Sequence, residues 1–128
     1  MTTQELISRV YSAFNRRDVD GVFALMSDDV SWPKASEGGR VVGKHAIREY
    51  WTRQWAEFDP HVDPLEVVDR EDGTIEVRVR QLVKTLQGNI LSDTPVMHVY
   101  SVADGLILRM DISDEDGPVD GPSAAFTG

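Results

Sequence analysis

The stretch TIEVRVRQLVKTL, residues 74–86, decides the fold class of this 128-residue chain. Apolar and charged side chains alternate along most of it, with Ile75, Val77, Val79 and Val83 on one side and Glu76, Arg78, Arg80 and Lys84 on the other. A period of two is typical of an antiparallel strand with one face on the core and the other in solvent. The stretch therefore predicts a half-buried strand in the second half of the chain.

Two turn signals lie beyond this strand. Gly88-Asn89 and Asp104-Gly105 both suit the two-residue loop of a tight hairpin, and the second is the stronger signal. The pattern predicts strands near residues 62–70, 74–87, 90–103 and 106–113, which follow one another as an antiparallel meander.

The first half of the chain has helical periodicity instead. Thr2 and Glu5 have the spacing of a capping box, and an apolar stripe follows them: Leu6, Ile7, Val10, Tyr11 and Phe14. Asp18 can cap a second helix, and a third runs from Gly43 to the break at Asp59-Pro60. Val30 to Trp32 reads as a short strand. Helices followed by strands predict an α+β fold, with three N-terminal helices packed on a curved, mainly antiparallel sheet.

Composition limits the function. With 22 acidic and 13 basic residues, the net charge of −9 disfavours nucleic acid and anionic membrane surfaces as partners. The chain has no cysteine, which excludes disulfides and thiolate chemistry. We expect a domain at residues 1–116, a Gly/Pro-rich tail at 117–128, no membrane span and a cytoplasmic location.

Cofactor motifs are missing from the sequence. There is no glycine-rich phosphate loop or dinucleotide fingerprint, and His45, His61 and His98 lack the spacing of a metal site. We therefore expect no cofactor and no metal.

Three local strings carry a resemblance to a known family. SAFNRRDVDGVFALMSDDVSW (12–32), GKHAIREYW (43–51) and HVYSVADGLI (98–107) resemble, in order and spacing, the SnoaL-like (nuclear transport factor 2-like) superfamily over residues 4–113. The resemblance implies a cone, also described as ketosteroid-isomerase-like, with an internal cavity. It covers cyclases, isomerases, dehydratases, hydrolases and noncatalytic domains, so it does not fix the activity.

Site residues of individual subfamilies match unequally. The three key groups of steroid isomerases fall on Val10, near Lys34 and near Met97, and none is retained. Limonene-type epoxide hydrolases have an arginine and an aspartate at positions that correspond to Arg78 and Arg80 here. The SnoaL-like polyketide cyclases match better: their histidine corresponds to His98, and their general-base aspartate to Asp111 across a one-residue gap.

Hairpin geometry supports the same pair. A two-residue loop at Asp104-Gly105 places His98 opposite Asp111, within about 5.5 Å between Cβ atoms. The same reasoning at Gly88-Asn89 places Val79 opposite His98. One sheet face then holds Val77, Val79, Gln81, Val83, Val96, His98, Tyr100, Arg109 and Asp111. An apolar face with a few convergent polar groups is typical of a small-molecule pocket.

We therefore predict an acid–base enzyme that abstracts a proton beside the carbonyl of a hydrophobic compound, as a polyketide cyclase or isomerase does. Asp111 is the predicted base and His98 its partner. The predicted ligand-binding residues are Tyr11, Trp32, Trp51, Trp55, Gln81, Tyr100 and Arg109. The alternative is a noncatalytic small-molecule-binding or assembly domain, in which the His–Asp pair is structural and the tryptophans belong to the core.

The last strand leaves one question open. Its apolar residues, Leu106, Leu108, Met110 and Ile112, alternate with Arg109 and Asp111. If the apolar residues face the helices, Asp111 is solvated. Alternatively, Asp111 faces the pocket and the apolar residues are covered because the outer sheet face forms a homodimer. We predict the homodimer. If the strands instead have the register of the steroid isomerases and epoxide hydrolases, Arg78 and Arg80 point into the cavity.

Overall fold

The helices begin at the capping residues that the sequence predicts. Thr2 caps α1 (Thr3–Asn15), accepting a hydrogen bond from the Glu5 backbone N–H at 3.1 Å. Asp18 caps α2 (Val19–Phe23) in the same way, through the Gly21 N–H. Helix α3 (Lys44–Glu57) ends directly before the next strand. The three predicted helices are therefore confirmed.

The computed structural model describes residues 1–34 and 37–113, so the predicted tail at 117–128 lies outside the described residues. Its strands are β1 (Met26–Pro33), β2 (Arg40–Val42), β3 (Phe58–Asp69), β4 (Thr74–Thr85), β5 (Ile90–Ala103) and β6 (Leu106–Ser113). The meander of the last four is confirmed. The six-stranded order is β2-β1-β6-β5-β4-β3. Two features were not predicted: strand β2, and the parallel pairing of β1 with β6.

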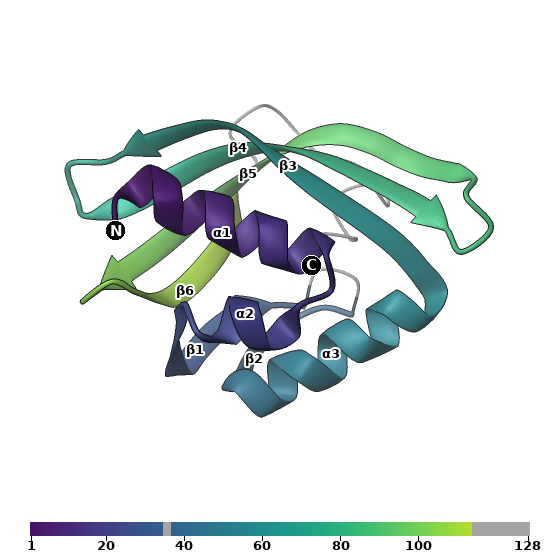
Figure 1. Cartoon of the computed structure of the whole chain (residues 1–128), viewed down its shortest axis with the longest axis horizontal. Coiled ribbons are helices and arrows are strands. Elements are labelled where there is room, and N and C mark those ends of the chain that lie inside the picture. Colours follow the sequence, from purple (N-terminus) through teal and green to yellow (C-terminus); the bar gives the residue numbers. More distant parts are fainter. Residues whose placement is uncertain (35–36, 114–128) are drawn as a thin grey trace.

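The sheet curves around the helices and makes an open cone. Figure 1 shows α1 lying across the inner side of the long strands, with α2 and α3 next to β1 and β2. Apolar side chains from all three helices and the inner sheet face form one core. Trp32 and Trp51 are buried in this core, and Trp55 is partly buried against it.

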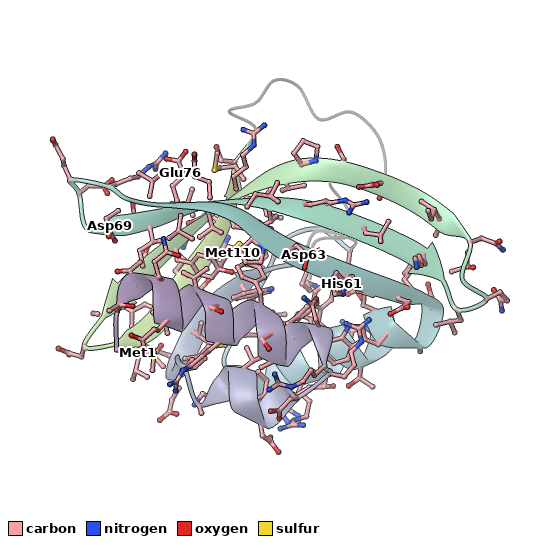
Figure 2. All side chains as sticks on the ribbon, turned by 45° about the horizontal axis from the view of Figure 1, so that its top comes forward. Met1, His61, Asp63, Asp69, Glu76 and Met110 are labelled. Carbon is pink, nitrogen blue, oxygen red and sulfur yellow. The ribbon has the colours of Figure 1, made fainter. Side chains whose placement is uncertain are left out.

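The outer face of the sheet carries charged side chains in pairs. His61 contacts Asp63 at 3.0 Å, and both are labelled in Figure 2. Arg70 binds Glu76 at 2.7 Å, and Arg80 binds Asp93 at 2.6 Å. Arg80 therefore belongs to the solvated side of β4, as its place in the alternation predicts. In residues 1–34 and 37–113 no helix is long and apolar enough to cross a membrane.

Strand register differs from the prediction at both hairpins. His98 lies opposite Val77 rather than Val79, a slip of two residues that keeps every side chain on its predicted face. At the second hairpin the slip is one residue. His98 lies opposite Ile112, and Asp111 lies opposite Val99. The predicted His98–Asp111 pairing is therefore wrong.

A β-bulge causes the second slip. Val102 pairs with Ile107 and Ser101 with Arg109, so Leu108 has no partner on β5. One extra residue on a strand reverses the face of everything beyond it. Asp104 and Gly105 both have positive φ, 53° and 76°, as the predicted two-residue turn requires. The turn was predicted correctly, and the bulge after it was not.

The free edge of β3 is held by the end of α1. The Asn15 side chain donates to the Val62 carbonyl at 2.8 Å and accepts from the Val62 N–H at 2.9 Å. Arg17 donates to the carbonyl of Pro60 at 2.8 Å. The amide of Asn15 thus takes the place of a neighbouring strand beside Val62.

Candidate functional site

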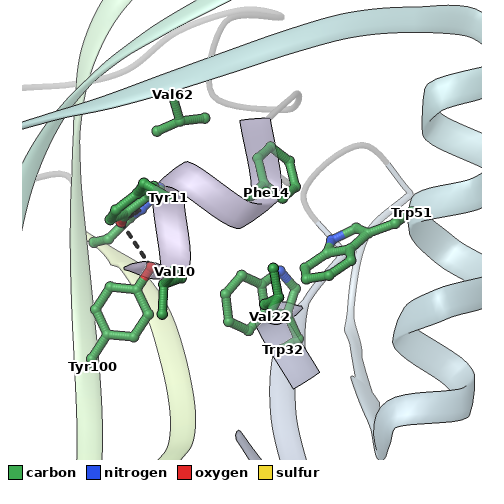
Figure 3. Close-up of a pocket in the computed structure, with 9 residues that line it drawn as sticks. Val10, Tyr11, Phe14, Val22, Trp32, Trp51, Val62 and Tyr100 are labelled. Atoms are coloured by element: carbon green, nitrogen blue, oxygen red, sulfur yellow. Dashed lines mark hydrogen bonds between the residues drawn. The ribbon is translucent and has the colours of Figure 1, made fainter. Parts of the chain in front are cut away.

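The candidate site is a small pocket between the helices and the inner sheet face (Figure 3). It is lined by side chains from α1, α2, β1, α3, β3 and β5: Val10, Tyr11, Phe14, Val22, Trp32, Trp51, Val62, His98 and Tyr100. The cavity volume is about 20 Å³, which is room for about one water molecule. The walls are apolar and aromatic, and the polar groups among them are few.

Three lining residues form a hydrogen-bonded chain, which we call the inner cluster: Tyr100, Tyr11 and His98. The Tyr100 hydroxyl donates to the Tyr11 hydroxyl at 2.7 Å, and the Tyr11 oxygen lies 2.6 Å from Nδ1 of His98. All three side chains are buried. Since the Tyr11 oxygen already accepts from Tyr100, its own proton is available to donate to His98.

This chain determines which nitrogen of His98 holds the proton. Burial lowers the pKa of His98 from 6.5 to about 3, so the ring is neutral at physiological pH. With Nδ1 accepting from Tyr11, the one ring proton is on Nε2. Nε2 is itself buried and has no protein partner. The inner cluster therefore ends in a neutral N–H donor that a bound molecule can use.

Burial also acts on the two tyrosines. It raises the pKa of Tyr11 well above its ordinary value of 10.0, and it raises the pKa of Tyr100 as well. Neither phenol ionises near neutral pH, because the anion would be desolvated. The whole inner cluster is thus uncharged.

Trp51 forms the aromatic end of the pocket. Its ring contacts those of Phe14, Phe23, Trp32 and Trp55, with centroids 5.3–5.8 Å apart. Trp55 lies behind Trp51, beneath the Arg17 guanidinium at 5.0 Å, and does not line the pocket. Five of the predicted site residues therefore meet here: Tyr11, Trp32, Trp51, His98 and Tyr100.

Asp111, the predicted base, lies on the opposite sheet face. Its carboxylate accepts from Arg109 at 2.9 Å and from Arg40 at 3.0 Å, and these three residues form the outer cluster. The two guanidinium groups lower the pKa of Asp111, mainly through hydrogen bonding from Arg109. Its side chain is 41% exposed. Asp111 is a solvated ion-pair partner here and has no contact with the pocket residues.

Two other predicted ligand-binding residues also lie elsewhere. Arg109 is on the outer face with Asp111, because the bulge at Leu108 turned both outward. Gln81 is fully buried on the inner face but is not among the lining residues. In the described ranges 1–34 and 37–113, no group of three or more His, Asp or Glu residues is arranged to hold a metal ion.

Sequence reasoning missed four apolar lining residues. Val10 and Phe14 belong to the same helical stripe as Tyr11, so the stripe was a usable signal for them. Val22 is an apolar residue of the second predicted helix, which was a similar signal. Val62 had no such signal. Val62 reaches the pocket because Asn15 fixes the backbone of β3 at that residue. This contact joins residues 47 positions apart, which periodicity does not reveal.

The fold and the pocket define a class: small α+β cones with an internal small-molecule pocket. The chain belongs to the SnoaL-like domain family, whose model matches residues 7–110. That match covers most of the helices and all but the end of the sheet, and it confirms the resemblance seen in the sequence.

Solved structures share the fold at low sequence identity. TerC co-crystallised with polyporic acid is 24% identical, with a TM-score of 0.74 over 85% of this chain and 88% of that one. A provisionally named polyketide cyclase from Pseudomonas putida is also 24% identical (TM-score 0.70; 88% and 91% covered). Rv0760c from Mycobacterium tuberculosis, in complex with estradiol-17β-hemisuccinate, is 21% identical (TM-score 0.72; 85% and 90% covered). Comparison with curated proteins gives no match.

Proposed function

We propose that this protein binds an apolar small molecule through a carbonyl oxygen. One observation carries the proposal: the neutral His98 Nε2–H, buried and without a protein partner, in an apolar pocket. Leaving such a donor unpaired costs free energy, and a hydrogen bond to a ligand oxygen contributes about 0.5–1.5 kcal/mol net. Complexes of similar structures with polyporic acid and estradiol-17β-hemisuccinate support small-molecule binding by this fold.

Binding requires the pocket to widen. A cavity of about 20 Å³ is much smaller than the roughly 300–1,000 Å³ of ordinary ligand sites. Lining side chains must therefore move when a ligand enters. Trp51 reports this movement directly, since its indole N–H signal in a ¹H–¹⁵N spectrum should shift on saturation with ligand.

The proposal is tested by changing His98 in two ways. His98→Leu removes the donor, and His98→Gln restores an N–H beside a carbonyl that can still accept from Tyr11. With 4-ethylacetophenone as probe, we expect calorimetry to show about 2- to 12-fold weaker binding for His98→Leu and recovery for His98→Gln. Equal affinity of the wild type and a folded His98→Leu protein contradicts the proposal.

A second candidate is proton abstraction beside the bound carbonyl, the reaction type of a polyketide cyclase or isomerase. The neutral His98 N–H favours it, because a donor aimed at the carbonyl oxygen stabilises the enolate that forms. The position of Asp111 weighs against it, and none of the nine lining residues is a carboxylate. Ligand binding is therefore the better-supported function.

Deuterium exchange separates the two candidates. An enzyme of this type should exchange the methyl protons of the bound acetyl group faster than buffer does, and His98→Leu should slow that exchange. NMR measures the rate. Exchange at the buffer rate in wild-type protein that binds the probe contradicts the catalytic candidate and leaves the binding role intact.

We also propose a homodimer formed through the outer sheet face. Apolar side chains lie between the ion pairs of that face, including Val99, which is partly exposed. Light scattering at micromolar concentration tests the oligomeric state, and a persistent monomer contradicts the dimer. A cytoplasmic location stays a prediction, and fractionation of the source cells tests it.

A further inference from the structure

Trp51, which lines the pocket, carries a second buried donor. Nε1 of Trp51 is buried and has no hydrogen-bond partner. The ring is fully buried, and its surroundings are other aromatic rings. Like Nε2 of His98, this N–H is a group that loses free energy when it is dry and unpaired. Two such donors in one small pocket call for a common explanation.

The two donors belong to opposite walls. His98 is on β5, beside Tyr100, and Trp51 comes from α3. Figure 3 shows Tyr100 and Tyr11 on the sheet side of the pocket and Trp51 across from them on the helix side, with Val22 and Trp32 between. A molecule that fills the pocket therefore meets one N–H at each end and apolar or aromatic side chains along its length.

We infer that the ligand is a flat, apolar compound with two acceptor oxygens at opposite ends, that is, a diketone or an equivalent dicarbonyl. This inference rests on the proposed function, to which it adds the second anchor. His98 Nε2–H donates to one carbonyl and Trp51 Nε1–H to the other. Because both donors are neutral, an uncharged ligand fits them without burying a net charge.

The test compares diketones with matched monoketones. We choose two lengths, 1,4-diacetylbenzene and 4,4′-diacetylbiphenyl, because the pocket widens on binding. In each partner compound an ethyl group replaces one acetyl group, which keeps the shape and removes one acceptor. We expect the wild type to bind at least one diketone about 2- to 12-fold more tightly than its partner.

Trp51→Phe keeps an aromatic ring and removes the N–H. It should lower the affinity for the preferred diketone to that of the monoketone and leave monoketone binding nearly unchanged. Trp55→Phe is the matched control, since Nε1 of Trp55 is also buried and unpaired but Trp55 does not line the pocket. This control should keep the full preference for the diketone. Calorimetry gives the affinities, and thermal melting shows that each variant is folded.

Each result bears on the inference. Equal binding of diketone and monoketone at both lengths overturns it while leaving the proposed function standing. A preference that survives in folded Trp51→Phe also overturns it, because the second anchor is then another group. Failure of all four compounds to bind the folded wild type contradicts the proposed function, and this inference falls with it.

Discussion

The inner and outer clusters lie on the two faces of the same sheet, yet they differ in charge. Tyr11, His98 and Tyr100 are buried and neutral, and burial shifts the pKa of each one away from ionisation. Arg40, Arg109 and Asp111 are partly solvated and ionised. The inner cluster comes from α1 and β5 and the outer cluster from β2 and β6. Because β5 and β6 are neighbouring strands of one sheet, position along the sheet does not explain the difference. The local environment does.

The comparison shows which cluster can act on an apolar ligand. In the outer cluster every charge has a partner and water has access, so a further hydrogen bond there gains little. In the inner cluster the last donor is dry and unpaired, so a ligand oxygen gains the whole hydrogen bond. The three predictions below test this contrast, beginning with the largest expected effect.

The first prediction breaks the inner cluster at its centre. Tyr11→Phe leaves both the Tyr100 hydroxyl and Nδ1 of His98 buried without hydrogen-bond partners. This should lower the free energy of unfolding by about 4 kcal/mol. Tyr100→Phe is the matched control. It leaves only an unused lone pair on Tyr11 and should cost about 1 kcal/mol. Urea denaturation measures both, and equal losses would contradict the directional chain.

The second prediction separates the clusters by pH. His98 has a lower pKa in the folded state than in the unfolded chain, so the unfolded chain binds the proton first. Stability should therefore fall as pH drops below 6.5 and go on falling towards pH 3, by about 2 kcal/mol between pH 6.5 and pH 4.5. Asp111, whose pKa is lowered, keeps its stabilisation throughout that range and loses it only below about 3.8.

His98→Gln removes the titrating ring and isolates this effect. The difference in unfolding free energy between the wild type and His98→Gln should depend on pH between 4.5 and 6.5, and Asp111→Asn should leave the wild-type slope unchanged there. Denaturation at several pH values measures the slopes. A His98→Gln protein with the wild-type slope would show that His98 is not buried as a neutral ring.

The third prediction concerns the outer cluster alone. Asp111→Asn removes one charge from a solvated network, so it should lower the free energy of unfolding by only about 0.5–1 kcal/mol. The loss should shrink in 1 M salt, where the Debye length is about 3 Å. Ligand affinity should not change, because Asp111 does not reach the pocket. A large loss of ligand affinity in folded Asp111→Asn would show that Asp111 takes part in ligand binding.

Most of the fold could be predicted from the sequence, because its helical and strand patterns repeat over many residues and its caps and turns are local. The capping residues Thr2 and Asp18, the alternation in residues 74–86 and the Asp104-Gly105 turn each depend on neighbours within a few positions. Strand β2 was missed, since three residues do not make a period. It pairs with β1 through its backbone, and the Arg40 side chain also reaches Ser31 and Asp111.

The site was predicted only in part, and the two hairpins show why. A slip of two residues at the first hairpin left His98 and Tyr100 facing the pocket, because side chains repeat every two residues. A slip of one at the second hairpin removed Asp111 and Arg109 from it. Leu108, the bulged residue, is 39% exposed, and Ile107 before it is buried. No local signal distinguishes Leu108 as the bulged residue.

The end of α1 also protects the molecule from other chains. An exposed edge strand invites an extended segment of another protein to add to the sheet, which leads to aggregation. On the free edge of β3, alternate residues 60, 62 and 64 direct their backbone towards the outside. Pro60 and Pro64 have no N–H to offer, and both backbone groups of Val62 are taken by Asn15. A foreign strand therefore finds no donor along this part of the edge, so the contact that shapes the pocket also keeps the sheet from growing.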